Sequence, residues 1–179
     1  MNEKEAVQLL KRYSTDEKSY EIVLAHSKAV QKIALEIARK IAAKGHKIDI
    51  EFIKNAALLH DIGRFKCKPG TSESIKHGVA GAEILRSEGI DERYALVCER
   101  HLGAGISKEA VKEQKLPLPL RDYTPKSVEE KVIAHADNLL WGTKAKTIKD
   151  VVERFTKEIG PECGKKVQAL NDELEGMMN

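Results

Sequence analysis

The chain has 179 residues, 41% of them hydrophobic, and its 31 Lys and Arg residues nearly balance its 28 Asp and Glu residues. This length fits a single domain with a sizeable core, and the composition excludes a disordered polymer. The apolar runs are too short for a membrane span, and residues 1–5 lack the start of a signal peptide, so we expect a cytoplasmic protein. The net charge of +3 shows no clustered basic excess and therefore does not favour a nucleic-acid partner.

Helical periodicity runs through the chain, and the five prolines all fall between the periodic stretches. This pattern predicts an all-α fold, a helical bundle with about seven to eight helices. The expected helices cover residues 3–12, a long stretch that ends at 44, 49–60, 75–87 and 91–102. A short helical piece follows residue 107, a further helix reaches 141, and two amphipathic helices end the chain. Capping boxes at 14–17 and 127–130 mark the starts of the long helix and of the helix that reaches 141. We expect one domain over 1–179, with a core at about 21–141 and a C-terminal helical extension at about 145–178.

Two apolar stripes should face the interior of the bundle. One includes Ile22, Val30, Ile33, Ile37 and Ile41 on the long second helix. The other comprises Ile148, Val152, Phe155 and Ile159, which we expect in the core, with a homodimer contact as the alternative. Trp141 fits simple packing at a helix end better than stacking on a base.

Four of the six histidines and one aspartate share apolar helical faces, and a second aspartate, Asp61, directly follows one of these histidines. The set consists of His26, His60, Asp61, His77, His101 and Asp137. A lone histidine on such a face is more often an ordinary core residue, and His135 fits that role, whereas His46 should be solvated. A buried carboxylate without partners is costly, and imidazole with carboxylate suits iron, manganese, nickel or zinc. The joint pattern therefore predicts that the six side chains bind metal inside the bundle.

The segment Leu59-His60-Asp61-Ile62-Gly63 resembles the motif of the HD-domain metal-dependent phosphohydrolases, in the HDIG subgroup. The order of the six side chains is similar to that family's full ligand series, over roughly residues 21–141. The resemblance implies one metal at His26, His60, Asp61 and Asp137. It implies a second metal at His77 and His101, with Asp61 bridging the two, as in the diadenosine tetraphosphate hydrolases of this superfamily. Iron or manganese is the expected cofactor, and nickel, zinc, cobalt or magnesium are the alternatives.

Two departures from related enzymes narrow the range of expected substrates. The stretch 100–105 has one histidine, and no Gly-Tyr-Pro follows it, so the chain differs from the cyclic-dinucleotide phosphodiesterases of the superfamily. Arg64 stands where some single-metal nucleotidases place a catalytic glutamate, which argues against their 5′-nucleotidase activity.

The expected activity is hydrolysis of a phosphate ester or anhydride of a nucleotide or similar small molecule by metal-activated hydroxide. His60 and Asp61 would belong to the catalytic centre, and Arg64, Lys76 and Arg100 would bind the substrate phosphate. Loops at 63–74 and 103–125 could close over the site. The alternatives are a non-catalytic nucleotide sensor and, with less support from the balanced charge, a nuclease.

Overall fold

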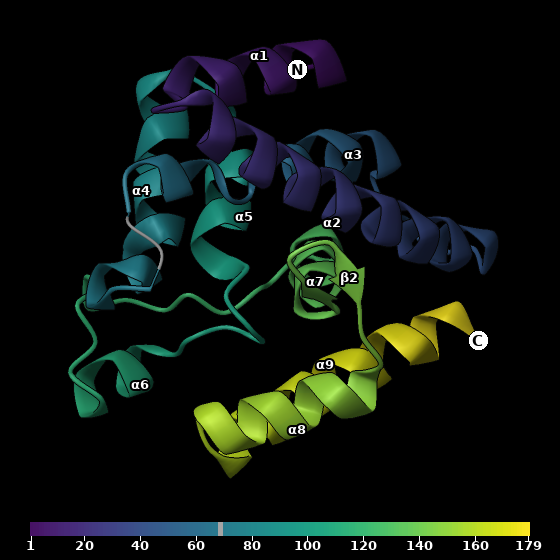
Figure 1. Cartoon of the computed structure of the whole chain (residues 1–179). Coiled ribbons are helices and arrows are strands. Elements are labelled where there is room, and N and C mark those ends of the chain that lie inside the picture. The colour runs from purple at the N-terminus through teal and green to yellow at the C-terminus, as the bar shows by residue number, and fades with distance from the viewer. Residues whose placement is uncertain (68–69) are drawn as a thin grey trace.

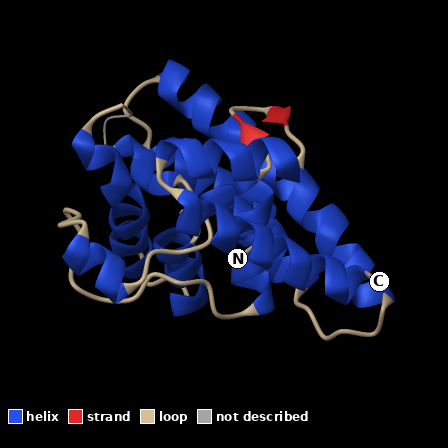
Figure 2. Cartoon of the chain, turned by 90° about the horizontal axis from the view of Figure 1, so that it is seen from below, coloured by secondary structure: helices blue, strands red, loops and turns tan. Residues whose placement is uncertain are grey.

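The computed structural model describes residues 1–67 and 70–179, and these form a helical bundle (Figures 1 and 2). The all-α prediction is confirmed, with nine α-helices in the described part of the chain, compared with the expected seven to eight. They are α1 (Glu3–Tyr13), α2 (Glu17–Ala43), α3 (Ile50–Leu59), α4 (His77–Ser87), α5 (Glu92–Arg100), α6 (Lys108–Glu113), α7 (Val128–Asn138), α8 (Ile148–Glu158) and α9 (Pro161–Met178). Two 3-10 helices, η1 (Ile62–Phe65) and η2 (Ser72–Lys76), and a small antiparallel hairpin of β1 (Leu140–Trp141) and β2 (Lys144–Ala145) complete the fold.

The helix starts follow local capping chemistry, with one change from the prediction. Ser127 accepts a hydrogen bond from the amide of Glu130 at 3.2 Å, as its spacing predicted. At the start of α2, however, Asp16 rather than Ser14 is the cap, and its carboxylate accepts from the amide of Ser19 at 2.8 Å. Of the predicted loop at 63–74, Lys68 and Pro69 lie outside the described residues, while η1 and η2 occupy much of the remainder.

Helix α7 lies in the middle of the bundle, in contact with α2, α3, α5 and α9 (Figure 1). The apolar faces of α2, α3 and α7 meet there and form the core, with Val30, Ile53 and Ile133 fully buried. Helices α4 and α5 pack together on one side of this centre, and α8 and α9 pack together on the other. The prediction that Ile22 belongs to the buried stripe was wrong, because this side chain is 60% exposed and the neighbouring Val23 is buried in the core instead.

The C-terminal helices α8 and α9 form a tight hairpin. Its close approach depends on Gly164, where an added Cβ would lie 2.0 Å from Oγ1 of Thr156. The inward residue of α8 is Val151, so the predicted core stripe of this helix is displaced by about one residue. Ile159 is 59% exposed and Phe155 is half-buried, because this face of α8 borders a cavity described below. Among the described helices, none is both long and apolar enough to cross a membrane.

Candidate metal centre

The fold brings the six predicted metal ligands to one place in the bundle. They come from α2 (His26), the end of α3 (His60 and Asp61), the junction of η2 and α4 (His77), the end of α5 (His101) and α7 (Asp137). Four of the six are buried. The side chains of His26 and Asp137 are 17% and 22% exposed, so the cluster has one open side.

Three of the histidines owe their orientation to helix ends. His60, His77 and His101 each occupy the cap position that follows the last residue of a helix. Each Nδ1 contacts the carbonyl oxygen three residues earlier, at 2.7, 2.6 and 2.7 Å respectively. The last carbonyls of a helix have no partner within it, and a carbonyl cannot donate, so each Nδ1 must carry the proton. A neutral ring in this position leaves the lone pair of Nε2 directed into the cluster.

The ring of His26 is oriented by a tertiary contact. Its Nδ1 donates to the carbonyl oxygen of Gly142 at 2.7 Å, across 116 residues of sequence. Gly142 lies in the turn of the β1–β2 hairpin with a φ of 61°, a conformation that favours glycine. The hairpin therefore fixes the ring of His26 from outside the helices.

The two carboxylates lie among the four Nε2 atoms. Oδ1 of Asp61 is 3.0 Å from Nε2 of His77 and 3.5 Å from that of His101. Its other oxygen, Oδ2, is 3.7 Å from Nε2 of His26 and 3.9 Å from that of His60. Oδ1 of Asp137 is 2.9 Å from Nε2 of His26 and 3.7 Å from that of His60. The two oxygens of Asp61 thus face two different pairs of histidines.

The electrostatics of the cluster keep both carboxylates ionised. Burial alone would raise the pKa of Asp61, but the imidazole groups of His60, His101 and His77 around it hold this pKa well below its usual range. Burial also opposes ionisation of Asp137, whose pKa is nevertheless lowered by its hydrogen bond with His26. Burial lowers the pKa of His101, which favours the neutral ring.

His26 behaves differently because it is the histidine next to Asp137. Burial lowers its pKa, but the hydrogen bond and the charge of Asp137 outweigh burial and raise the pKa of His26 to about 9. Without a metal, His26 is therefore protonated at neutral pH and forms an ion pair with Asp137.

The donor atoms fit divalent cations. Ligand bonds of about 2.0–2.2 Å place neighbouring donors on one ion roughly 3 Å apart, close to the spacings found here. Two overlapping sets have all their donors within 4.8 Å of one another: His26, His60 and Asp137, and His60, Asp61 and His101. Nε2 of His60 is buried and has no hydrogen-bond partner among the described residues. The Nε2 atoms of His77 and His101 face each other at 3.0 Å, an arrangement that a shared cation would stabilise.

The three basic residues predicted to bind phosphate lie in different surroundings. Arg64 borders the open side of the cluster, where its Nε donates to Oδ1 of Asp61 at 3.1 Å. Lys76 forms an ion pair with Glu73 at 2.5 Å and is not among the residues that line the cavity. The side chain of Arg100 is only 14% exposed, and its Nη1 donates to both oxygens of Glu130 at 3.1 and 3.0 Å. Of the three, only Arg64 is positioned to meet a ligand at the cluster.

The two remaining histidines lie outside the cluster. His46 is exposed, as predicted. His135 is buried, and burial lowers its pKa to about 4. Its Nδ1 has no hydrogen-bond partner in residues 1–67 and 70–179.

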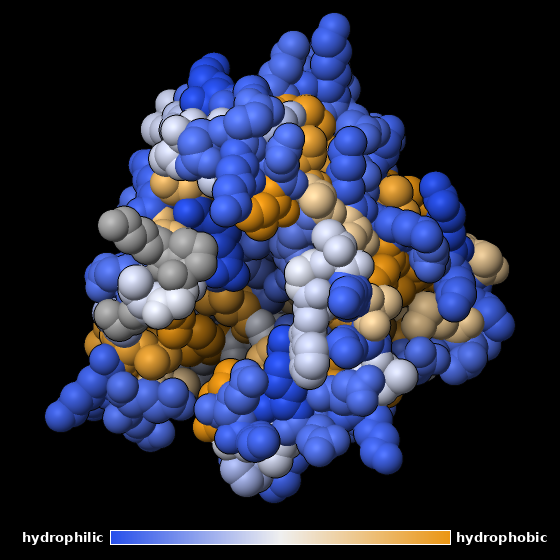
Figure 3. Space-filling view, in the orientation of Figure 1, coloured by the Kyte–Doolittle hydropathy of each residue, from blue (hydrophilic) through white to orange (hydrophobic). Residues whose placement is uncertain are grey.

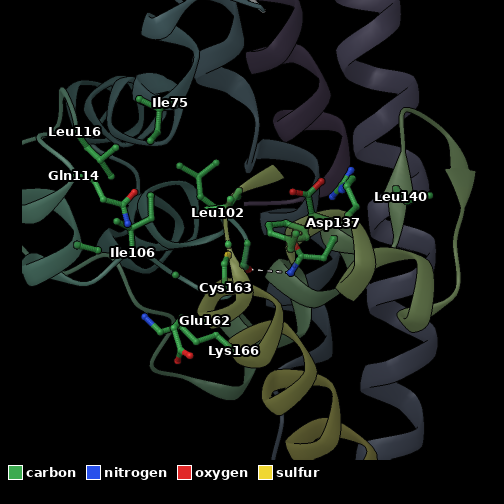
Figure 4. A pocket seen from close by; sticks show the side chains of 18 of the residues that line it. Ile75, Leu102, Ile106, Gln114, Leu116, Asp137, Leu140, Glu162, Cys163 and Lys166 are labelled. Carbon is green, nitrogen blue, oxygen red and sulfur yellow. Dashed lines mark hydrogen bonds between the residues drawn. The ribbon is translucent and has the colours of Figure 1, made fainter. Parts of the chain in front are cut away.

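A cavity of about 860 Å³ opens beside the cluster and is bordered by His26, Asp137 and Arg64. Figure 3 shows the hollow in the middle of this face, with hydrophobic and hydrophilic surface around it. The loop after His101 contributes Leu102, Gly103, Gly105 and Ile106, and α6 adds Ala110 (Figure 4). Residues 103–116 of the predicted loop thus border the cavity, and closure of the segment 103–125 over the site stays a prediction.

Sequence reasoning missed several residues around this cavity. Asn138 donates to the carbonyl oxygen of Gly103 at 2.9 Å and so ties the loop to α7. Arg154 and Lys166 line the cavity from the C-terminal helices. Neither residue belongs to a sequence motif, and both are far in sequence from the predicted metal ligands. The sequence therefore did not indicate that they line the cavity.

Three known proteins are similar to most of this chain. An uncharacterised protein of Methanocaldococcus jannaschii is 46% identical over 160 residues, which cover 88% of this chain and 90% of the relative. Two proteins named tRNA (cytidine(56)-2'-O)-methyltransferase, from Picrophilus torridus and Thermoplasma volcanium, are 34% and 38% identical over 98% and 95% of this chain. The chain spans about half the length of these two methyltransferases, 47% and 46%.

Solved structures show the same fold. The HD domain of the L. monocytogenes phosphodiesterase PgpH superposes with a TM-score of 0.55 at 18% identity, over 97% of this chain and 99% of that domain. The same domain in complex with cyclic-di-AMP superposes with a TM-score of 0.54. The family model described as HD domain matches residues 23–142, and this chain belongs to that family.

Proposed function

We propose that this protein is a metal-dependent phosphohydrolase that cleaves a phosphate ester or anhydride of a nucleotide or similar small molecule. The observation that carries the proposal is the convergence of four Nε2 atoms and two ionised carboxylates at the open side of one cavity. Such a donor set would hold one or two divalent cations, of which iron or manganese suits the mixed nitrogen and oxygen ligands best. Bound there, the cations would supply a Lewis acid that polarises the phosphoryl group and activates water.

The protein's own side chains would divide the work around those cations. His26, His60 and Asp137 would form one half of the site and His77 with His101 the other, while Asp61 faces both halves with its two oxygens. This division supports the two-metal site that the sequence resemblance implies. The backbone carbonyls behind each ring prevent it from rotating, so the donor geometry is set before the ligand arrives.

Arg64 is the residue best placed to bind the substrate phosphate. Its guanidinium borders the cavity, and its Nη1 donates to Oγ of Ser74 at 3.1 Å, which holds the side chain beside Asp61. A guanidinium in this position can donate its remaining N–H groups to phosphate oxygens. Lys76 and Arg100 remain predictions as substrate contacts, and their ion pairs with Glu73 and Glu130 favour a structural role.

A direct test measures phosphate release by the purified protein after loading with Mn²⁺ or with Fe²⁺ under anaerobic conditions. Mononucleotides, dinucleoside polyphosphates and cyclic dinucleotides would form the substrate panel. We expect Asp61→Asn and His60→Ala each to lower the rate more than about 100-fold and to lower the metal content. His46→Ala, which changes an exposed histidine outside the cluster, is the matched control. Nucleotide binding without turnover under every metal would instead identify a sensor.

A second candidate substrate is a phosphate carried by RNA. It is favoured by the two relatives named as tRNA methyltransferases, which match nearly the whole of this chain. The balanced net charge argues against extensive contact with an RNA backbone. Including 5′- and 3′-phosphorylated oligoribonucleotides in the panel, at low and high salt, separates the two candidates. The cytosolic location remains a prediction from the sequence.

A further inference from the structure

One wall of the cavity comes from the C-terminal helices α8 and α9, which lie outside the family-matched residues 23–142. Figure 4 shows Lys166 and Glu162 of α9 at the lower edge of the cavity, away from Asp137. Phe155 of α8 packs closely against the loop after His101. An added Cβ on Gly103 of this loop would lie 3.0 Å from Cε1 of Phe155. This contact makes the wall a packed part of the cavity.

Two basic side chains on this wall form no ion pair with a described residue, although Lys166 lies near enough to Glu162 to contribute to the lowered pKa of that carboxyl. Arg154 and Lys166 line the cavity, and neither forms an ion pair within residues 1–67 and 70–179. Elsewhere Arg86, Arg100 and Arg121 are each paired with a glutamate. Arginine side chains in a folded protein usually find an acceptor, so an unpaired guanidinium at a cavity indicates that a ligand supplies one.

Aromatic rings hold the guanidinium of Arg154 in position. Its Cζ lies 4.8 Å from the ring centroid of Phe155 and 5.4 Å from that of Trp141. These contacts are cation–π interactions, and no hydrogen bond from the guanidinium to another described residue accompanies them. Its N–H groups are therefore free to donate to an anion.

The start of α9 adds positive potential to the same wall. This helix has 18 residues, begins at Pro161 after Gly160, and has no side-chain cap at its N-terminus. The helix dipole favours an anion near this end, where the amide of Glu162 is the free donor, since Pro161 has no N–H and the amide of Cys163 donates to the carbonyl oxygen of Gly160 at 3.1 Å. The one acidic residue of its first turn, Glu162, is exposed and forms an ion pair with Lys165 at 2.7 Å. Lys165 therefore offsets its charge.

We propose that Arg154 and Lys166, beside the N-terminus of α9, form a second anion subsite, separate from the metal centre. The proposal rests on the proposed function, because it places the scissile phosphate at the cluster of histidines and aspartates. The preferred substrate is then a nucleotide with a second phosphate, and the base or sugar contacts the apolar side chains of Leu102, Ile106 and Phe155. The subsite acts on the affinity for the substrate and supplies no group to the bond that breaks.

The test measures binding without requiring turnover. Trp141 is the only tryptophan of the chain and lines the cavity, so its fluorescence reports a ligand there. EDTA-treated protein would be titrated with AMP, with ATP and with adenosine 3′,5′-bisphosphate, and the titrations repeated after addition of Mn²⁺. Calorimetry on the same samples controls for any change in Trp141 emission that the substitution of Arg154 itself causes. The variants are Arg154→Gln and Lys166→Gln, with Lys157→Gln as the matched control, an exposed lysine of α8 that does not line the cavity.

We expect wild-type protein to bind at least one of the two ligands with a second phosphate about tenfold more tightly than AMP. Arg154→Gln should remove this preference and Lys166→Gln should reduce it, while Lys157→Gln should retain it. If Arg154→Gln weakens the binding of ATP, the second phosphate is contiguous with the first. If it weakens the binding of the 3′,5′-bisphosphate, the two phosphates are separate. The proposal is overturned if wild-type protein shows no preference, or if Arg154→Gln weakens all three ligands equally. Since the titration needs no catalysis, the preference can be confirmed even if phosphate release is never observed.

Discussion

The raised pKa of His26 predicts that metal binding to this protein depends steeply on pH. In the metal-free protein the pKa of His26 is about 9, because the hydrogen bond and charge of Asp137 outweigh the effect of burial. A metal ion binds the neutral ring, so at pH 7 it must displace a proton from His26. At pH 7 the pH is about two units below the pKa of His26, and each unit adds about 1.4 kcal/mol to the free energy of removing the proton.

The affinity for metal should rise as the pH rises towards about 9, because the metal-free protein holds the extra proton on His26 below that pH. We expect the apparent dissociation constant for Mn²⁺ to fall about tenfold between pH 7 and pH 8, and to level off above about pH 9. Over the whole range from pH 7 the gain should be about 100-fold.

Isothermal titration calorimetry in buffers of different ionisation enthalpy measures both quantities. The number of protons released per Mn²⁺ at pH 7 should be close to one for the ion that His26 binds. The substitution Asp137→Asn removes the partner that raises the pKa, so the variant should bind metal more weakly but release less than half a proton at pH 7. An affinity that is the same at pH 7 and pH 8, with no proton release, would refute the assignment of the His26–Asp137 pair.

Two further predictions concern stability. Gly164→Ala places a Cβ 2.0 Å from Oγ1 of Thr156 and 3.2 Å from the carbonyl oxygen of Val152, so the Thr156 side chain must move or α8 and α9 must separate, and we expect a loss of about 1–3 kcal/mol in chemical denaturation. Gly176→Ala, in the same helix with open space around its Cβ, should instead be neutral or stabilising, and equal effects of both substitutions would contradict this reasoning. Glu99 is 5% exposed and accepts hydrogen bonds from two arginines, so Glu99→Gln should cost about 3 kcal/mol. Glu109→Gln, an exposed change, should cost less than about 0.5 kcal/mol, and a similar small loss for both would count against a buried ion-pair network.

The sequence by itself determined much of the metal centre. Periodicity placed each of His26, His60, His77, His101 and Asp137 on the inward face of a helix, and the structure brings all five to one point. This succeeds because a 3.6-residue period fixes the face on which a side chain lies, whatever the helix later packs against. The placement of three histidines at helix ends was also local, since each Nδ1 uses a carbonyl only three residues away.

Tertiary structure decided what each face meets. Arg100 is the last residue of α5, next to His101, but it pairs with Glu130 of α7, a partner that its neighbours in sequence do not indicate. The carbonyl of Gly142 orients His26 across 116 residues.

The cavity shows the same limit of sequence reasoning. Ile159 and Phe155 have the pattern of a core stripe, yet they border a cavity, because α8 buries Val151 against its neighbour instead. Periodicity gives the direction of a side chain relative to its own helix axis, whereas the distance to another helix and the space between helices arise only when the whole bundle packs.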